Sequence, residues 1–250
     1  LYVATSSDGL TFEEGTFVLE HAGVPNLLLS SSGQLILTYQ LFSFEDEVMF
    51  DVIVYSTSDD DGKTWTSPQK IIFEDLPESI DSGKVPMDPT LVEIEDGALR
   101  LYFTYHTKGA KQAALYSATA VDGDITSPFV VEETPALSVD GMLLDPAVIY
   151  FDEKWHHYTW QLESDDNYHS VSDDGISFSL EDDINLPMEF LGQIIVFDDG
   201  LRFYGTGKGG VVSAFSSDGY TWEMDDGSRI QGADPGVAEL NDGTYIMVYT

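Results

Sequence analysis

The chain has 250 residues, of which 42% are hydrophobic and 12% aromatic, so it can bury one sizeable core, and we expect a single domain over residues 1–250. Its 45 acidic and 10 basic residues give a formal net charge of -35, which argues against nucleic acid or an anionic lipid surface as a partner. The absence of cysteine excludes disulfides, thiolate catalysis and cysteine-bound zinc, and no apolar run approaches the ~18 residues of a membrane-spanning helix.

The predicted elements, taken in chain order, begin and end inside the same repeat. Residues 1–12 read as the second pair of strands of a unit, and residues 233–250 read as its first pair, around an Asn-Asp-Gly turn. Joined, the two segments make one complete unit. Because Leu1 already belongs to a predicted strand, we expect a trimmed start, and the sequence shows no targeting segment.

Each unit opens with an equivalent position, which we call a slot. Three Asp-Pro pairs each lie nine residues before a turn. At the same distance before the two other turns lie a Val-Pro pair and a Leu-Gly pair. The five slots are Val24, Asp88, Asp145, Leu191 and Asp234.

A turn motif of the form Ser-x-Asp-Gly-x-Thr-Trp follows each slot at a propeller-like period of roughly 40 to 50 residues with inserts. Its five copies are centred on Asp8, Asp61, Asp122, Asp174 and Asp218. An aspartate in such a turn satisfies backbone amides, so we interpret the motif as a structural turn and not as a catalytic signal.

These patterns predict an all-β protein, a five-bladed β-propeller with four antiparallel strands in each blade. Stacking the blades around an axis leaves only short, protected sheet edges. We expect the closing blade to combine strands from both ends of the chain. The predicted blades are residues 23–82, 83–139, 140–187, 188–232, and 233–250 together with 1–22.

In this topology the slots of all blades face one end of the central channel. We call this end the upper face; it also holds the loops between the second and third strands. Asp88, Asp145 and Asp234 should ring the channel mouth, where close carboxylates drive their pKa values apart as a general acid and base require. The alternative is that each aspartate caps backbone N–H groups beside its proline.

Further candidates for substrate binding come from the upper loops and from strand positions beside the slots. Lysines in these loops either reverse the acidic field locally or form salt bridges with the ring aspartates, and the aromatic residues either stack on sugar rings or pack between blades. The candidates are Asn26, Tyr39, His106, Lys108, Trp160, Gln161, Gln193 and Lys208.

The sequence requires no cofactor, but two kinds of cation site are conceivable. Calcium or sodium in the central channel would be held by His106 and the three aspartates, and calcium also suits the acidic clusters at residues 58–62 and 164–167. We interpret His156, His157 and His169 as packing residues of strands. The acidic surface otherwise suits a solvated shell in high salt, as in halophilic proteins.

The turn motif, complete from Ser58 to Trp65, resembles the Asp box of sialidases. The segments that begin at Asp145 and Asp234 resemble the inner hairpins of five-bladed glycoside hydrolases, notably family 43. The resemblance covers nearly the whole chain and implies an aspartate base, a second aspartate that tunes the pKa of the acid, and a glutamate acid. It also implies a secreted, extracellular or periplasmic protein, including one at the cell surface, although the acidic shell equally suits a salt-adapted cytoplasm.

Two assignments of these roles follow from the resemblance. In the first, Asp145 tunes and Glu189 is the acid, but the base position falls in the blade of Val24, which has no carboxylate. In the second, Asp234 is the base, Asp88 tunes, and Asp145 stands in the place of the acid.

Two functions remain open from the sequence. The first is a monomeric glycoside hydrolase acting on neutral sugars, and the second is a non-catalytic surface propeller that binds carbohydrate or protein. With only three arginines, Arg100, Arg202 and Arg229, the chain lacks the pattern needed to clamp a sialic acid carboxylate.

Overall fold

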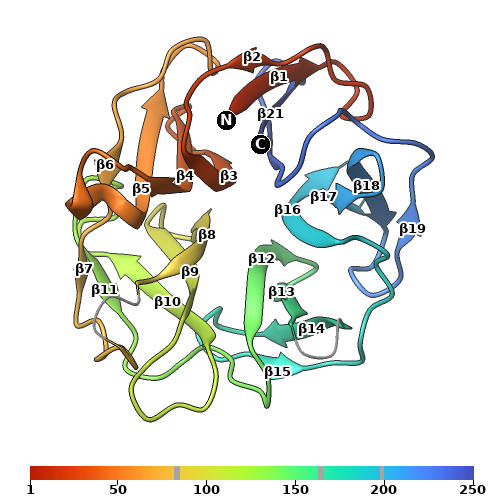
Figure 1. Cartoon of the computed structure of the whole chain (residues 1–250). Helices are drawn as coiled ribbons and strands as arrows, with labels where there is room; N and C mark the ends of the chain where they lie inside the picture. The colour runs from red at the N-terminus through yellow and green to blue at the C-terminus, as the bar shows by residue number, and fades with distance from the viewer. Residues whose placement is uncertain (82–84, 163–165, 198–199) are drawn as a thin grey trace.

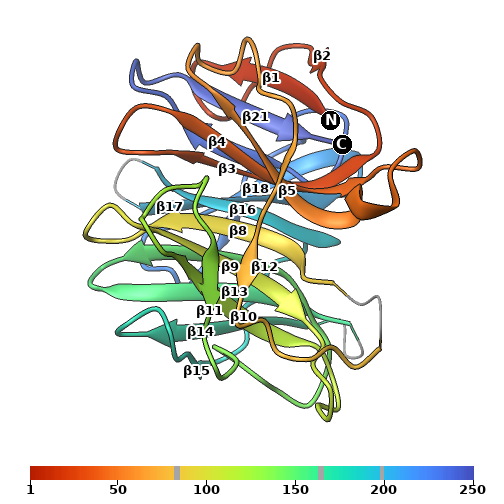
Figure 2. The same ribbon diagram turned by 90° about the vertical axis from the view of Figure 1, so that its left-hand side faces the viewer.

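The computed structural model of the protein describes residues 1–81, 85–162, 166–197 and 200–250. Five separate β-sheets surround a central axis (Figure 1) and stack side by side when the molecule is turned (Figure 2). The all-β, five-bladed propeller predicted from the repeat is therefore confirmed. In the described part of the chain, no helix has the length and apolar character to span a membrane.

Blades 1 and 2 differ in their number of strands. Blade 1 contains β3 (Ala22–Leu29), β4 (Leu35–Phe42), the 3-10 helix η1 (Glu47–Met49), β5 (Phe50–Ser58) and β6 (Gln69–Lys70). Blade 2 contains β8 (Met87–Glu93), β9 (Leu99–Tyr105), β10 (Ala114–Ala120) and β11 (Phe129–Val131). A fifth strand, β7 (Phe73–Glu74), pairs in parallel with β11, so this segment belongs to blade 2 and not to blade 1 as its predicted boundary implies.

Blades 3 and 4 are regular four-stranded meanders. Blade 3 contains β12 (Leu143–Phe151), β13 (Lys154–Gln161), β14 (Asp166–Ser172) and β15 (Ser179–Leu180). Blade 4 contains β16 (Phe190–Phe197), β17 (Gly200–Gly207), β18 (Gly210–Ser216) and β19 (Glu223–Met224).

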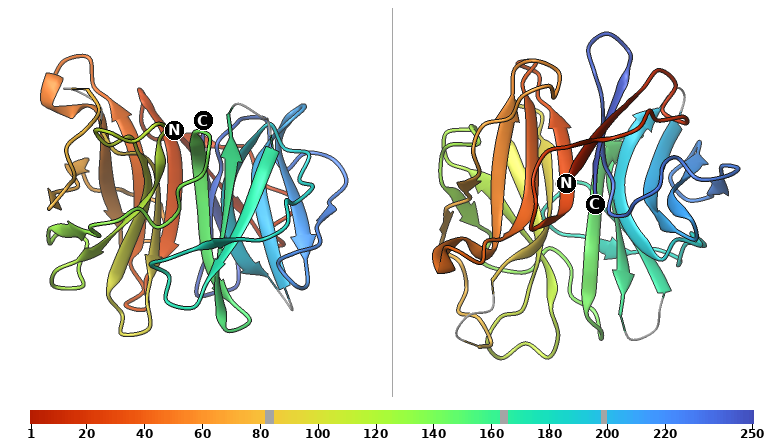
Figure 3. Two further views of the ribbon diagram at one scale, coloured as in Figure 1. Left: turned by 90° about the horizontal axis from the view of Figure 1, so that it is seen from below. Right: turned by 45° about the horizontal axis from the view of Figure 1, so that its top comes forward.

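Blade 5 closes the ring with strands from both ends of the chain. Its order is β2 (Thr16–Phe17), β1 (Tyr2–Ser6), β21 (Tyr245–Tyr249) and β20 (Gly236–Glu239). Strand β1 pairs with β21 over its whole length, and the two termini lie side by side (Figure 3). The closing blade predicted from the two half-repeats is thus present.

The hydrophobic core lies between neighbouring blades. Five clusters of buried side chains fill the five interfaces of the ring. Between blades 1 and 2, for example, Ile53 packs in one cluster with Phe103, and between blades 3 and 4 the rings of Tyr158 and Phe203 meet at 5.4 Å. Because each blade packs against two others, closure of the ring buries both faces of every sheet.

The turn motifs on the lower face, opposite the upper face, stabilise this packing. In the copy from Ser58 to Trp65, the aspartate that accepts the turn bonds is Asp60 and not the predicted Asp61, which has a left-handed backbone (φ 57). Asp60 accepts from Thr64 N and Ser58 Oγ, both at 2.8 Å, and the bonds from Thr64 hold the pKa of its carboxyl below the usual range. Asp8, Asp174 and Asp218 accept equivalent backbone bonds. Their contacts are those of structural turns, so their carboxylates are engaged by the turn itself.

Candidate active site

The innermost strands β3, β8, β12 and β16 carry four of the slots to the channel mouth, and the fifth slot, Asp234, lies just before the innermost strand β20. In the first four, the pairing with the second strand shifts at the slot, as in a β-bulge. The slot residues with left-handed backbone are Val24 (φ 49), Asp88 (φ 54), Asp145 (φ 50) and Asp234 (φ 48). Such a backbone costs about 1 to 3 kcal/mol for a residue other than glycine, and it persists where surrounding structure enforces it, often at active sites.

The bulges bring the three aspartates together. Asp88, Asp145 and Asp234 line one narrow cavity at the axis, together with Val24 and Gly192 from the remaining blades. Its volume of about 20 Å³ holds roughly one water molecule and is far below the roughly 300 Å³ of a small-ligand pocket. A sugar would therefore contact the carboxylates from above the mouth.

Asp88 is the most enclosed of the three, with 8% of its surface exposed. Its Oδ2 accepts a hydrogen bond from Asp145 N at 3.4 Å. Burial, reinforced by the charges of Asp234 and Asp51, raises the pKa of Asp88 to about 6, although hydrogen bonds from Asp145 N and the Thr104 side chain oppose the shift. Asp88 thus influences its neighbours electrostatically while having little surface for a ligand.

Asp145 and Asp234 are half-buried and keep part of their surface at the mouth. Burial raises the pKa of Asp145 well above its usual value, and the charges of Asp88 and Asp234 raise it further. Burial also raises the pKa of Asp234, but the Thr250 hydroxyl donates a 3.0 Å hydrogen bond to Asp234 Oδ2 and favours the ionised form. The two carboxyls therefore have different environments, as an acid and base pair requires.

A fourth carboxylate, Asp51, was not among the predicted site residues. Gln40 Nε2 donates to Asp51 Oδ1 at 2.5 Å, and Gln40 Oε1 lies 3.5 Å from Asp88 N, so Gln40 connects the two aspartates. Asp51 also has a left-handed backbone (φ 56). It begins a third strand, where the repeat pattern gives no signal, so only the pairing of β4 with β5 reveals it.

Blade 4 offers no carboxylate at its slot. The pairing of β16 with β17 resumes at Ile194, which makes Gly192, and not the predicted Leu191, the equivalent of Asp88. A Cβ on Gly192 would lie 2.7 Å from Pro235 O and 2.8 Å from Tyr204 O, so close approach of backbone requires glycine here.

Glu189 lies outside the cavity. It is exposed just before β16, and its backbone N–H donates to Thr206 O at 2.7 Å. The carboxyl set that lines the cavity is Asp88, Asp145 and Asp234. Of the two predicted assignments, only the second places all of its carboxylates at the cavity.

Asn26 and Gln193 tie the inner strands together. Leu91 N donates to Asn26 Oδ1 at 2.9 Å. Gln193 Oε1 accepts from Leu27 N at 2.8 Å and from Val237 N at 3.0 Å, and its Nε2 donates to Leu27 O. These buried amides join separate blades, and their bonding groups are occupied by protein. We therefore assign them a structural role in place of the expected substrate contacts.

Tyr39 and Gln161 are also removed from ligand contact. Tyr39 is 1% exposed within the core between blades 5 and 1, where its hydroxyl lies 3.1 Å from Ser56 Oγ and burial raises its pKa to about 12. Gln161 is buried, and its side chain packs closely against Gly141. Burial contradicts the expectation that these two side chains face the upper surface.

The basic residues of the upper loops lie apart from the ring aspartates. Lys108 Nζ forms an exposed 2.7 Å ion pair with Glu78, and Lys208 is exposed in the turn between β17 and β18. His106 Nε2 lies 3.3 Å from Ala110 O. Within residues 1–81, 85–162, 166–197 and 200–250, no ion pair reaches Asp88, Asp145 or Asp234, so the predicted salt bridges to them are absent there.

Of the residues suggested as ligands of a channel cation, the three aspartates line the cavity, whereas His106 is not part of its lining. Among the described side chains, no group of three or more His, Cys, Asp or Glu residues has the arrangement of a metal site. The acidic cluster at 164–167 lies partly outside the described residues. A channel calcium or sodium ion stays a prediction from the sequence.

Trp160 is the candidate that provides an aromatic surface near the mouth. It is half-buried, and its ring meets that of the 43% exposed Phe190 edge to face at 5.6 Å. Trp160 pairs with Leu144, just before Asp145, as Thr104 pairs with Met87, just before Asp88. This register places Trp160 next to the slot of its own blade.

Comparison with solved structures supports the fold. The protein is similar to a putative glycoside hydrolase from Parabacteroides distasonis (14% identity over 98% of this chain and 91% of the other, TM-score 0.66). It is also similar to an endo-arabinase from Bacteroides thetaiotaomicron (15%, 91% and 88%, TM-score 0.65) and to the family 117 glycoside hydrolase Zg3597 from Zobellia galactanivorans (12%, 91% and 84%, TM-score 0.63). No protein-family model and no curated protein sequence matches the chain.

At these identities the comparisons establish a shared architecture. The protein has the five-bladed propeller fold found in glycoside hydrolases, and its activity has to be argued from its own site.

Proposed function

We propose that the protein is a glycoside hydrolase that cleaves neutral oligosaccharides or polysaccharides by carboxylate acid and base catalysis. The observation that carries this proposal is the convergence of Asp88, Asp145 and Asp234, from three blades, on one cavity in which all three pKa values are raised. The solved glycoside hydrolases with this fold support the reaction class.

The electrostatics of the cavity suggest one role for each aspartate. Asp145 is the general acid, because burial and two neighbouring charges raise its pKa and so favour the protonated form of its carboxyl. Asp234 is the general base, because the Thr250 hydroxyl stabilises its ionised form. Asp88 is a positioning residue, since it accepts the backbone N–H of Asp145 and raises the pKa of that residue by its charge.

In the proposed reaction, Asp145 gives its proton to the glycosidic oxygen as the bond from this oxygen to the anomeric carbon breaks. Asp234 removes a proton from a water molecule whose oxygen bonds to the same carbon. Both carboxyls are half-buried at the mouth, which allows contact with a sugar above the cavity. The configuration of the released sugar, followed by NMR, tests the direct attack by water.

Neutral sugars suit the charge distribution of the protein. A sugar acid would meet the net charge of -35 and would need a cationic clamp. All three arginines are engaged elsewhere: Arg100 donates to Asp174 O, Arg202 pairs with Asp225 at 3.0 Å, and Arg229 donates to Leu10 O.

The experiment is a screen of nitrophenyl glycosides and of plant and algal oligosaccharides at several salt concentrations, because salt screens the acidic surface. We expect Asp145→Asn and Asp234→Asn to lower kcat at least about 100-fold. Asp140→Asn, which removes one exposed charge, serves as the control and retains activity. Hydrolysis that persists unchanged in both site variants would refute the assignment.

One observation favours a second candidate, a non-catalytic carbohydrate- or protein-binding propeller. The cavity of about 20 Å³ does not enclose a sugar ring. A protein that only binds carbohydrate on its surface does not need an enclosing pocket. Binding of oligosaccharides by the unmodified protein without hydrolysis of any of them would support this function over the first.

A further inference from the structure

An exposed group of aromatic rings lies on the upper face of blade 1. His21, Phe42, Phe44 and Phe50 form what we call the blade 1 aromatic cluster. The rings of His21 and Phe44 are 5.0 Å apart, those of Phe44 and Phe50 5.5 Å, and those of Phe42 and Phe50 6.4 Å. Phe44 is 72% exposed and Phe50 45% exposed, so the cluster presents ring surface to solvent.

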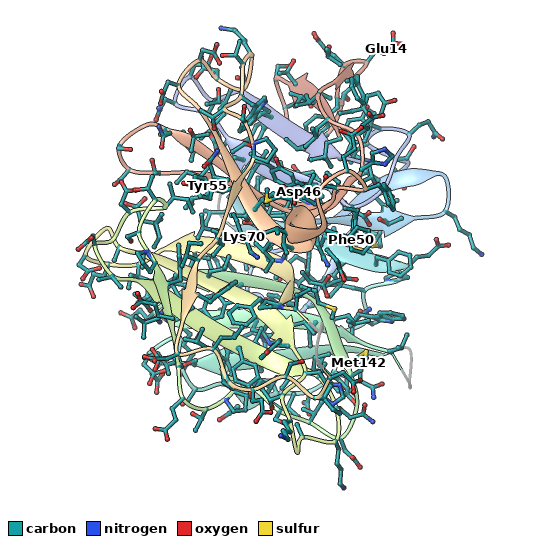
Figure 4. All side chains as sticks on the ribbon, turned by 60° about the vertical axis from the view of Figure 1, so that its left-hand side comes forward. Glu14, Asp46, Phe50, Tyr55, Lys70 and Met142 are labelled. Atoms are coloured by element: carbon teal, nitrogen blue, oxygen red, sulfur yellow. The ribbon has the colours of Figure 1, made fainter. Side chains whose placement is uncertain are left out.

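The cluster is joined to the aspartate cavity on one side. Phe42 packs over Gly23, with its Cε2 atom 3.6 Å from the position of a Cβ there, and the next residue, Val24, lines the cavity. Phe50 immediately precedes Asp51. Figure 4 labels Asp46, on the loop that joins β4 and β5, and Phe50, the first residue of β5.

A hydrogen-bond chain provides a second connection. Asp51 accepts from the Gln40 amide at 2.5 Å, and the Gln40 carbonyl oxygen lies 3.5 Å from Asp88 N. The buried Gln40 amide therefore links Asp88 at the cavity to Asp51, which lies next to the exposed ring of Phe50. Sugar recognition needs this combination, because a sugar ring has apolar C–H faces and a rim of hydroxyls.

The net charge of the protein limits which classes of ligand can bind to the blade 1 aromatic cluster. A net charge of -35 repels nucleic acid, anionic lipid and a second copy of the chain, whereas it does not oppose a neutral ligand. A further exposed ring, Phe17, lies on the outermost strand of blade 5, away from the axis. The blade 1 aromatic cluster differs from it by its continuity with the aspartates.

We propose that Phe44, Phe50 and Asp51 form an additional sugar-binding site, so that the substrate is a linear neutral oligosaccharide extending from the cavity mouth across blade 1. The aromatic rings stack on the sugar faces, and Asp51 accepts hydrogen bonds from sugar hydroxyls. This inference rests on the proposed function, since it assumes that the unit to be cleaved lies at the aspartates.

The test measures affinity as a function of chain length. Linear arabino-, xylo-, fructo- and manno-oligosaccharides of one to six units are titrated by calorimetry into the Asp145→Asn protein. For the series that binds, we expect affinity to rise with length up to the units that cover blade 1. Adding Phe44→Ala or Phe50→Ala should weaken binding of the longer chains about three- to tenfold, and Phe44→Trp should retain it.

Phe17→Ala, which removes a similarly exposed ring from blade 5, should leave every affinity and any hydrolysis unchanged. The proposal is overturned if no oligosaccharide binds, if affinity does not depend on length, or if Phe17→Ala causes the same loss as Phe44→Ala. It is also overturned if light scattering shows a dimer that Phe44→Ala dissociates.

The two proposals fail in distinguishable ways. Length-dependent binding that requires Phe44, without hydrolysis by the unmodified protein, refutes the catalytic function and leaves the sugar site standing. Hydrolysis that depends on Asp145 but is insensitive to chain length refutes the sugar site alone.

Discussion

Replacement of Asp88 by asparagine is expected to stabilise the protein at neutral pH. Asp88 is nearly enclosed, and its burial together with the charges of Asp234 and Asp51 raises its pKa to about 6 from the ordinary value of 3.8. An ionised Asp88 is thus less favourable in the folded than in the unfolded chain. Asparagine keeps the shape and can still accept from Asp145 N through its carbonyl oxygen.

The size of the gain follows from the pKa difference. About two pKa units at 1.36 kcal/mol each correspond to about 3 kcal/mol once Asp88 is ionised in both states, which holds above pH 6. Because the folded pKa is the higher one, the cost of ionisation shrinks as pH falls through 6 and vanishes below about 3.8. For a chain of this size, about 3 kcal/mol corresponds to a rise in Tm of roughly 6 to 12 °C.

The assay is urea and thermal unfolding of the unmodified protein and of Asp88→Asn between pH 4 and 8, with Asp140→Asn as the control for the loss of one surface charge. The stability difference should be largest at pH 7 to 8 and should fall towards zero near pH 4. If Asp88→Asn is less stable than the unmodified protein at pH 8, or if its gain in stability does not change with pH, then burial does not disfavour the ionised form of Asp88.

Three further predictions concern the stability of the propeller. Gly192→Ala should destabilise the protein by roughly 1 to 3 kcal/mol, because the added Cβ meets two backbone oxygens. Gly23→Ala, whose Cβ has an ordinary contact at 3.6 Å, should leave the stability nearly unchanged. Urea unfolding compares the two variants, and equal effects would contradict the reasoning. Gln193→Leu leaves buried backbone N–H groups of two strands unpaired and should lower the free energy of unfolding, by the same measurement, by roughly 2 to 5 kcal/mol. The control Gln231→Leu, at an exposed position, should change it little. Burial lowers the pKa of His157 to about 3 from 6.5, so the folded protein loses stability as pH falls from 6.5 towards 3. His157→Gln should reduce that loss by roughly 3 kcal/mol at pH 4. If the variant loses stability in acid as much as the unmodified protein, the buried His157 is not the cause.

Much of the candidate site follows from spacing along the chain. The equal distance from Asp88, Asp145 and Asp234 to the following turns placed them at equivalent positions, and the propeller brings them to one mouth. Spacing failed in blade 4, where the slot is Gly192, eight and not nine residues before Gly200. Counting cannot detect such a change, because the bulge is defined by pairing between strands.

Other predicted contacts failed because side-chain direction depends on packing. Gln161 ends the second strand β13, as expected, and Tyr39 lies within the second strand β4, yet both side chains are buried. Phe44, Phe50 and Asp51 carry no repeat signal, since they lie in the loop between β4 and β5 and at the start of β5, a connection whose length differs from blade to blade.

The amino-acid sequence by itself determined the number of blades, the closing blade and the acidic surface, because repeated turns and alternating strands act locally and charge is additive. Only the tertiary structure decided that Asp88 is enclosed, that Asp145 and Asp234 are half-buried, and that Gln40 connects Asp51 to Asp88. Burial and Coulomb repulsion depend on distances between blades, and these distances are fixed only when the ring closes.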